Sequence, residues 1–215
     1  VGAYGQEVSE TIREVRCFDR ESKTIVALTN TDCGFSYRRS IFNSTMRDRY
    51  VVLAGVFDLV ANGEPKLVYK DLIDQFKGRE PSLSEVRAAV LTIRRAKSMV
   101  IDVQDPNSQS AGSFFKNPLV ELSILEKIEE QFDRVPHFEA GEKVKIPAAW
   151  LIENAGLEKG FRLGNAGISS NHTLALINCG GSTATEIIEL KDLIQRRVET
   201  QFGIHLEPEP IFVGF

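Results

Sequence analysis

The stretch SAGSFFKNP, residues 110–118, sets one small hydroxyl among apolar and conformationally special residues. Gly112 precedes Ser113 and lets the backbone bend or approach another group closely. Two phenylalanines follow and predict that the segment is buried, while Lys116 and Asn117 bring polar groups against it. Taken alone, Ser113 is explained as a helix cap or a turn residue, because serine is favoured at both positions. The alternative is a chemically active hydroxyl held in apolar surroundings.

The rest of the composition is ordinary for a globular protein. The chain has 215 residues, enough for one large domain or two small ones, with 42% hydrophobic residues, 26% charged residues and a formal charge of −4. No long basic tract is present, so a nucleic-acid partner is not expected. The most apolar stretch, residues 51–61, is too short to span a bilayer and contains Asp58, so membrane insertion is not expected.

The cysteines bear on the compartment and on metal binding. They are odd in number, scattered, and lack the spacing of metal ligands, so no metal site is expected. This usage indicates a reducing compartment, and we expect a cytoplasmic protein. The cysteines are Cys17, Cys33 and Cys179.

The first third of the chain predicts strands. Residues 12–18, 23–30 and 49–60 are rich in β-branched and aromatic residues and are separated by polar or glycine-containing segments. The arginine-rich connection 33–49 is too long for a simple hairpin turn. Residues 61–65, ANGEP, predict a turn.

Beyond residue 82 the hydrophobic period changes to that of helices. Ser82 with Glu85 and Thr183 with Glu186 have the spacing of capping boxes. A strand is predicted over 172–180, a linker over 98–110 and an extended tail after the last helix. Helices are predicted over residues 82–97, 118–132, 147–156 and 182–203. This order predicts an α+β fold, because strands and helices alternate only weakly.

Several polar residues could carry chemistry, and each also has an ordinary explanation. Arg38 lies beside another arginine in a connection, where such residues are usually solvated, although a guanidinium also binds anions bidentately. Glu209 is explained as a surface carboxylate near a chain end, and His172 as a structural hydrogen-bonding residue. Tyr69 and Lys97 are uninformative alone. The pattern G-x-S-x-G is absent, so Ser113 is not predicted to be a hydrolase nucleophile.

Taken in order, the motifs resemble one family, the UDP-N-acetylenolpyruvoylglucosamine reductases (MurB). The resemblance extends over the whole chain. GSFFKNP is its most specific motif, and YR-x-S-x-F is the next. The motifs are GAYGQE (2–7), YRRSIF (37–42), AGSFFKNP (111–118), AAWLIE (148–153) followed by AG, HTLALIN (172–178) and LEPEP (206–210).

The resemblance implies three catalytic residues. The serine of GSFFKNP corresponds to the family's proton donor, which is Ser113 here. The first arginine after the motif's tyrosine is Arg38, and the second glutamate of LEPE is Glu209. Reduced flavin would give hydride to the β-carbon of an enolpyruvyl ether. Arg38 and Glu209 would stabilise the resulting enediolate, and Ser113 would protonate its α-carbon.

The resemblance also implies substrate contacts. The substrate would be UDP-N-acetylglucosamine enolpyruvate. Tyr69 matches a tyrosine that closes over the UDP part, and its presence places the chain in the branch of the family that has this loop. The substrate-binding residues are expected to be Tyr37, Tyr69, Lys97, Asn117 and His172.

The cofactors implied are FAD and NADPH. Gly2, Ala3, Tyr4 and Gly5 would bring backbone close to the flavin cofactor. Since VGAYGQEV has no initiator methionine and no glycine-rich pyrophosphate-binding segment precedes it, we expect a fragment that lacks the N-terminal FAD-binding part. The chain alone would then be inactive, and the complete protein is expected to be a monomer.

The domains implied are a remainder of a vanillyl-alcohol-oxidase-type FAD domain and a MurB-type substrate domain. The first spans 1–98 and the second 102–202, and residues 203–215 would return to the first as a terminal strand. Two further hypotheses stay open. One is a non-catalytic UDP-sugar-binding remnant that cannot hold flavin, and the other is a purely structural chain in which the Ser113 segment is a helix cap.

Overall fold

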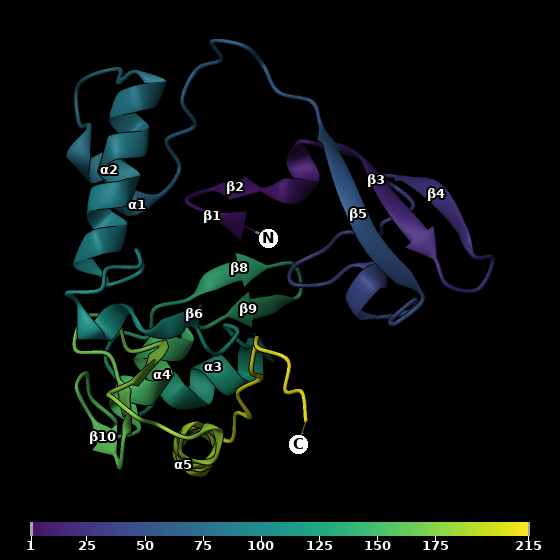
Figure 1. The fold of residues 1–215 in the computed structure, drawn as a ribbon. Coiled ribbons are helices and arrows are strands. Elements are labelled where there is room, and N and C mark those ends of the chain that lie inside the picture. The colour runs from purple at the N-terminus through teal and green to yellow at the C-terminus, as the bar shows by residue number, and fades with distance from the viewer. Residues whose placement is uncertain (1, 215) are drawn as a thin grey trace. The chain divides into compact units, whose positions relative to one another are not determined.

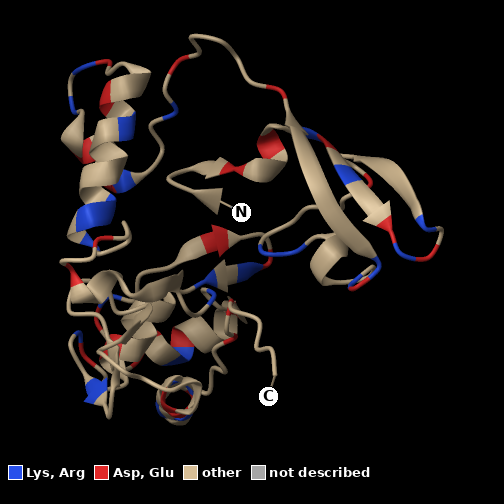
Figure 2. Ribbon diagram, in the orientation of Figure 1, with Lys and Arg blue, Asp and Glu red and all other residues tan. Residues whose placement is uncertain are grey.

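The computed structural model describes residues 2–214, and the chain forms two compact units divided between Val90 and Leu91. Figure 1 shows the elements of both units, and each unit is described by itself. Strands and helices are mixed, as expected for an α+β fold. Acidic and basic residues are interspersed along the ribbon of each unit (Figure 2).

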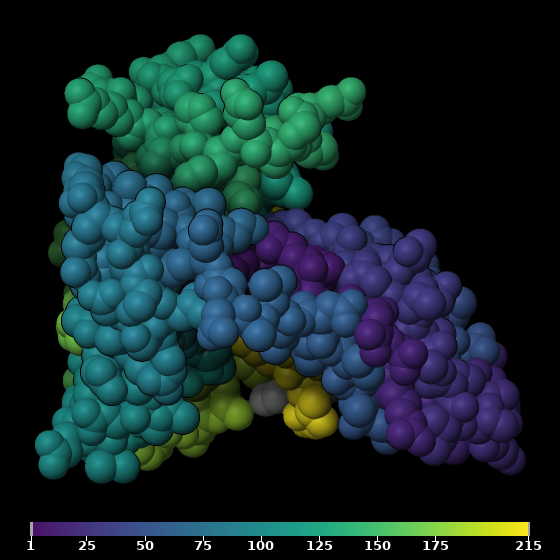
Figure 3. Space-filling model, turned by 90° about the horizontal axis from the view of Figure 1, so that it is seen from above, coloured from purple at the N-terminus to yellow at the C-terminus, as the bar shows by residue number. Residues whose placement is uncertain are grey.

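The first unit is built on a three-stranded antiparallel sheet in the order β4-β3-β5. Its strands are β3 (Ile12–Asp19), β4 (Thr24–Thr29) and β5 (Tyr50–Phe57), which confirms the three predicted strands. A small core lies on one face of the sheet, where Ile12, Val15, Cys17 and Cys33 are buried. The surface of this unit is drawn in purple and blue in Figure 3. Apolar side chains of β5, such as that of Val52, are exposed to solvent.

Short elements complete the first unit. They are β1 (Gly2–Ala3), β2 (Gln6–Glu7), the 3₁₀ helices η1 (Val8–Glu10) and η2 (Ile41–Asn43), the helix α1 (Lys70–Gln75), and the start of α2 (Leu83–Ala96). The predicted capping box of α2 is present, because Glu85 accepts from the N–H of Ser82 at 2.8 Å while the Ser82 hydroxyl accepts from the N–H of Glu85 at 3.3 Å.

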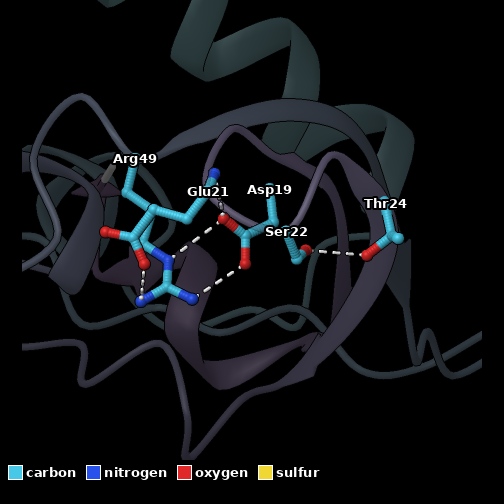
Figure 4. A network of polar contacts seen from close by, with 5 residues as sticks. All are labelled: Asp19, Glu21, Ser22, Thr24 and Arg49. Carbon is cyan, nitrogen blue, oxygen red and sulfur yellow. Dashed lines mark hydrogen bonds and ion pairs between the residues drawn. The ribbon is translucent and has the colours of Figure 1, made fainter.

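An ion-pair network fastens the end of β3 to the start of β5. Arg49 donates from Nε and Nη2 to the two oxygens of buried Asp19, at 3.1 and 2.8 Å (Figure 4). The same guanidinium pairs with exposed Glu21 at 2.9 Å. Hydrogen bonding to Arg49 lowers the pKa of Asp19 to about 2. The connection 33–49 is therefore tied back onto the sheet at its far end.

The second unit contains two sheets and the larger core. One sheet has four antiparallel strands in the order β10-β11-β12-β6, and the other has three in the order β7-β9-β8. The strands of the four-stranded sheet are β10 (Arg162–Leu163), β11 (Ala166–Ile168), β12 (Ala175–Asn178) and β6 (Ser110–Ser113). The other strands are β7 (Leu119–Glu121), β8 (Phe138–Ala140) and β9 (Lys143–Lys145).

Three helices pack with these sheets: α3 (Leu122–Glu129), α4 (Ala148–Asn154) and α5 (Ala184–Phe202). Their apolar faces form one cluster that includes Leu125, Leu151 and Ile194. The Thr183 capping box begins α5, and Gly203 ends it at a φ of +66°, as predicted. The predicted helix over 118–132 was wrong in its first turn. Leu119–Glu121 is strand β7, because it pairs with β9, a partner that the local sequence does not reveal.

Two further segments bear on the expected domains. The predicted linker 98–110 is an ordered connection with its own 3₁₀ helix, η3 (Pro106–Ser108), and the start of β6. The described part of the tail, through residue 214, groups with the second unit, and its expected return to the first stays a prediction. The tail groups with the second unit because its backbone bonds to residues 114–116. The expected domain boundaries themselves stay predictions.

Among residues 2–214, no helix is long and apolar enough to cross a membrane. The same described residues contain no group of three or more metal-binding side chains.

Candidate functional site

Ser113 is the last residue of β6, at the edge of the four-stranded sheet. Its backbone pairs with Ala175 of β12, and the next residue, Phe114, donates from its N–H to the carbonyl of Leu174 at 2.8 Å. The two phenylalanines after Ser113 are buried. Gly112 has a φ of +79°, a conformation that favours glycine. Ser113 is therefore a half-buried strand residue, and the helix-cap explanation is wrong, because the next helix begins at Leu122.

The tail runs beside the segment that follows Ser113 and brings Glu209 to it. The N–H of Glu209 donates to the carbonyl of Phe114 at 2.8 Å, and Phe115 forms an antiparallel bridge with Pro208. The backbone N–H of Lys116 completes the pairing by donating to the carbonyl of Glu207 at 2.9 Å. The backbone of Glu209 thus lies opposite Phe114, the residue next to Ser113, although the two segments are distant in the sequence.

Asn117 has a structural role in the same segment. Its Oδ1 accepts a hydrogen bond from the N–H of Ala148 at 2.9 Å. Ala148 is the first residue of α4, where backbone N–H groups lack partners within the helix. Asn117 therefore caps α4 from outside the helix.

His172 lies in the loop before β12, and Lys97 follows the last residue of α2. Burial lowers the pKa of His172, and the positive charges of Lys97 and then Lys159 lower it further. The Nδ1 of His172 accepts from the N–H of Leu174 at 3.1 Å. The neutral ring consequently carries its proton on Nε2, which makes His172 a hydrogen-bond donor without a positive charge. The positive charge of Lys97 is thus close enough to disfavour the protonation of His172.

Arg38 and Tyr37 occupy the tip of a tight turn in the first unit. The N–H of Ser36 donates to the carbonyl of Arg39 at 2.9 Å, and the N–H of Arg39 donates to the carbonyl of Ser36 at 3.0 Å. Arg38 has a φ of +55°, and its guanidinium lies 5.5 Å from the ring centroid of Tyr37. Arg38 is half-buried whereas Arg39 is exposed. The two neighbouring arginines therefore differ in surroundings.

The residues expected to contact the cofactor form a small hairpin in the first unit. β1 pairs with β2, and Tyr4 and Gly5 make the turn, with φ values of +53° and +82°. The ring of Tyr4 lies 5.0 Å from that of Tyr69, which caps α1. An added Cβ on Gly5 would lie 1.9 Å from Val68. Glycine at position 5 is thus required by the chain's own packing.

The expected site residues therefore fall into two groups. The second unit pairs the backbone of the tail around Glu209 with the segment after Ser113, and it brings the charge of Lys97 near His172, while Asn117 caps the start of α4. The first unit carries Arg38, Tyr37, Tyr69 and the hairpin 2–5. The sequence reasoning missed the residues that bind the loop 98–108 to the loop 169–172, since serine and asparagine there indicated only turns.

Comparison with known proteins gives the family. Residues 104–213 match the model of the C-terminal domain of UDP-N-acetylenolpyruvoylglucosamine reductase. The chain belongs to this family. Curated UDP-N-acetylenolpyruvoylglucosamine reductases align with its full length, at 41% identity for that of Thermobifida fusca and 42% for those of Salinispora arenicola and Streptomyces coelicolor. The chain spans 63%, 61% and 59% of those three relatives, which is about three fifths of their length.

A solved structure of the reductase family shares the fold. The crystal structure of UDP-N-acetylenolpyruvylglucosamine reductase (MurB) from Thermus caldophilus superposes with a TM-score of 0.55 at 22% identity. The match covers 97% of this chain and 55% of that chain. At this identity the likeness concerns the fold alone. It agrees with the mixed α+β architecture and does not test the expected FAD-domain remainder.

Proposed function

We propose that the complete protein reduces UDP-N-acetylglucosamine enolpyruvate to UDP-N-acetylmuramate in peptidoglycan synthesis, with NADPH and FAD as cofactors. Membership of the reductase family supports this proposal. Because the chain spans about three fifths of its curated relatives, the activity is proposed for the complete protein. We propose the cytoplasm as its location, in keeping with three free cysteines.

One observation carries the proposal: the pairing of the tail with residues 114–116 sets Glu209 beside the segment that begins with Ser113. A hydroxyl and a carboxyl are the two groups needed where an enolpyruvyl ether is protonated at its α-carbon. The buried phenylalanines next to Ser113 would keep water from that position. The helix-cap alternative gives no reason for the tail to pair beside this segment.

The residues would share the chemistry as follows. Bound FAD would supply the hydride that reaches the β-carbon of the substrate. Arg38 would bind the substrate carboxylate bidentately as negative charge develops, and Glu209, protonated, would donate a hydrogen bond to the enediolate. Ser113 would give its proton to the α-carbon. A weak acid is sufficient there, since an enediolate carbon is strongly basic.

The other expected residues would bind the substrate. Lys97 and neutral His172 would offer donors to the diphosphate and nucleotide, and Asn117 would offer its amide nitrogen. Tyr69 would cover the UDP part, and Tyr37 would support Arg38 by the contact of their side chains.

The hairpin of Gly2, Ala3, Tyr4 and Gly5 fits an edge contact with bound FAD, but it does not fit the pyrophosphate. A Cβ on Gly2 would lie 2.2 Å from Oε1 of Glu7, so a carboxylate lies directly against this backbone. A pyrophosphate needs a run of N–H donors and no neighbouring negative charge. We therefore propose that these four residues contact FAD only at the margin of its site.

The test is Ser113→Ala in the complete reductase, with its two half-reactions measured separately. Reduction of flavin by NADPH should be preserved, because that step takes no proton from Ser113. Turnover of the enolpyruvyl substrate should fall by about 10²–10⁴-fold. Ser110→Ala, on the same strand, is the matched control and should keep both rates. An equal loss in both half-reactions would overturn the proton-donor role. Substrate binding without any turnover in the unaltered protein would favour the UDP-sugar-binding remnant.

A further inference from the structure

Buried polar side chains are concentrated in two loops of the second unit. Ser98 and Ser108 lie in the connection after α2, and Ser169 and Thr173 lie in the loop before β12. Each is less than a tenth exposed. Buried polar groups cost free energy unless they are hydrogen-bonded, so such a concentration marks a conformation that is fixed by specific bonds.

Five residues join these loops in a closed ring of hydrogen bonds, called here the Ser98–Asn171 ring. Asn171 donates from Nδ2 to the Ser98 hydroxyl at 2.8 Å. Hydrogen bonding to Ser98 also lowers the pKa of the Asp105 carboxyl. Asp105 accepts from the N–H of Asn107 at 2.9 Å. The Oδ1 of Asn107 accepts from the N–H of Ser170 at 3.0 Å, and the peptide bond from Ser170 to Asn171 closes the ring.

The backbone of Ser98 indicates that the ring holds a strained position. Ser98 has a φ of +54°, in the left-handed region that residues with a Cβ rarely adopt. Ser98 is 2% exposed, and its hydroxyl accepts the hydrogen bond from Asn171. Local strain of this kind persists where the surrounding structure fixes the conformation, and it is common at binding sites.

The two residues expected to bind the nucleotide are sequence neighbours of two members of the ring. Lys97 directly precedes Ser98, and His172 directly follows Asn171. Resting on the proposed function, we propose that the Ser98–Asn171 ring positions Lys97 and His172 relative to each other for the UDP part of the substrate. Ser98, Asp105, Asn107, Ser170 and Asn171 are then positioning residues that act through Lys97 and His172.

The ring explains why a loop of apparent linker composition is ordered. Asp105 begins η3, and the Ser108 hydroxyl donates within the same loop. The Asn171 N–H donates to the Ser169 hydroxyl at 3.1 Å. Both loops thus have internal bonds, and the ring fixes one loop against the other. Loosening the ring would let His172 gain contact with water and let Lys97 move away from it.

The test uses Ser98→Gly and Asn171→Ala in residues 1–215, with UDP as the ligand. Glycine tolerates the left-handed backbone, so Ser98→Gly removes the hydroxyl without adding strain. Gln195→Ala is the control, because it removes another buried hydrogen bond in the same unit, from Gln195 Nε2 to the carbonyl of Leu206 at 2.8 Å. The pKa of His172 is measured by NMR of labelled histidine and assigned with His172→Gln, and UDP affinity is measured by titration on the same samples.

Both ring variants should raise the pKa of His172 toward its ordinary value and weaken UDP binding by about 3–10-fold, whereas the control should do neither. An unchanged His172 pKa in both ring variants would overturn the positioning role. A raised pKa with unchanged UDP affinity would show that the ring orders His172 but would contradict its assignment to the nucleotide. That outcome would count against the substrate-binding part of the proposed function and leave the Ser113 chemistry to its own test.

Discussion

Lys116 and Glu207 form an ion pair, with 2.6 Å between Nζ and Oε1. The carboxylate of Glu207 is thus bound to Lys116 at the point where the tail meets the Ser113 segment. Glu209 follows two residues later. In the complete reductase, Glu209→Gln should therefore reduce turnover far more than Glu207→Gln, because an exposed ion pair contributes little. Steady-state rates with the enolpyruvyl substrate measure this. Equal losses in the two variants would mean that the wrong glutamate is assigned.

Arg38 and Arg39 can be separated in the same way. Arg38 is half-buried at the tip of its turn, whereas Arg39 is exposed. Arg38→Lys should lower kcat strongly, since a lysine cannot bind a developing enediolate through two parallel bonds, and Arg39→Lys should have little effect. The assay is turnover of the complete protein at saturating substrate. A larger effect of Arg39→Lys would shift the catalytic assignment by one residue.

Asn117 offers a test that separates capping from binding. Asn117→Ala should lower the free energy of unfolding by about 0.5–2 kcal/mol, because the N–H of Ala148 loses its acceptor. Asn117→Asp keeps an acceptor oxygen and should preserve stability. Both variants lose the amide nitrogen, so both should weaken binding of the UDP-sugar substrate. Denaturant unfolding and substrate titration measure the two effects, and preserved binding in Asn117→Asp would leave Asn117 with a structural role only.

The pH dependence of stability should reveal the Asp19–Arg49 pair. The pKa of Asp19 is lowered from 3.8 to about 2 in the folded state. A lowered carboxyl pKa stabilises the fold above the unfolded value, and this stabilisation is lost as the pH falls from about 4 to about 2. Asp19→Asn should therefore destabilise the protein at pH 7, and the difference from the unaltered chain should shrink through that window.

Glu21→Gln is the matched control for this measurement. Glu21 contacts the same guanidinium at 2.9 Å but is 69% exposed, so its loss should change stability little at any pH. Thermal unfolding followed by circular dichroism between pH 2 and pH 7 is suitable. A constant difference between Asp19→Asn and the unaltered chain across the whole range would contradict the lowered pKa.

Residues 1–215 should not retain FAD. The hairpin 2–7 presents the Glu7 carboxylate against Gly2, which disfavours a pyrophosphate. Mixing the chain with excess FAD, followed by size-exclusion chromatography and flavin fluorescence, measures retention. Stoichiometric flavin after the column would show that these residues hold the cofactor unaided, and our account of the hairpin would be wrong.

The sequence predicted well those elements whose signals are local. The capping boxes of Ser82 and Thr183 and the stop at Gly203 each depend on groups a few residues apart, and all are present. Short strands such as β7 were missed because their stability depends on partners distant in the chain. The first turn of the predicted helix over 118–132 is strand for that reason.

The membership of the site stays a prediction, and the sequence did not indicate how its residues are grouped. Motifs proposed Ser113, Glu209 and His172 one at a time, and none of them indicated that the tail would pair beside residues 114–116. The Ser98–Asn171 ring could not be predicted, because serine, aspartate and asparagine in a loop are equally typical of simple turns. Its bonds join residues that are some seventy positions apart, which a single sequence does not reveal.

The bonds that hold the tail to the Ser113 segment join peptide groups, at 2.8 and 2.9 Å. Peptide groups are common to all residues except for the missing N–H of proline, so this attachment places few demands on side-chain identity. Substitutions at neighbouring tail positions should therefore leave the backbone of Glu209 in place. An inserted or deleted residue between Glu207 and Glu209 would instead shift the register and move the carboxyl away.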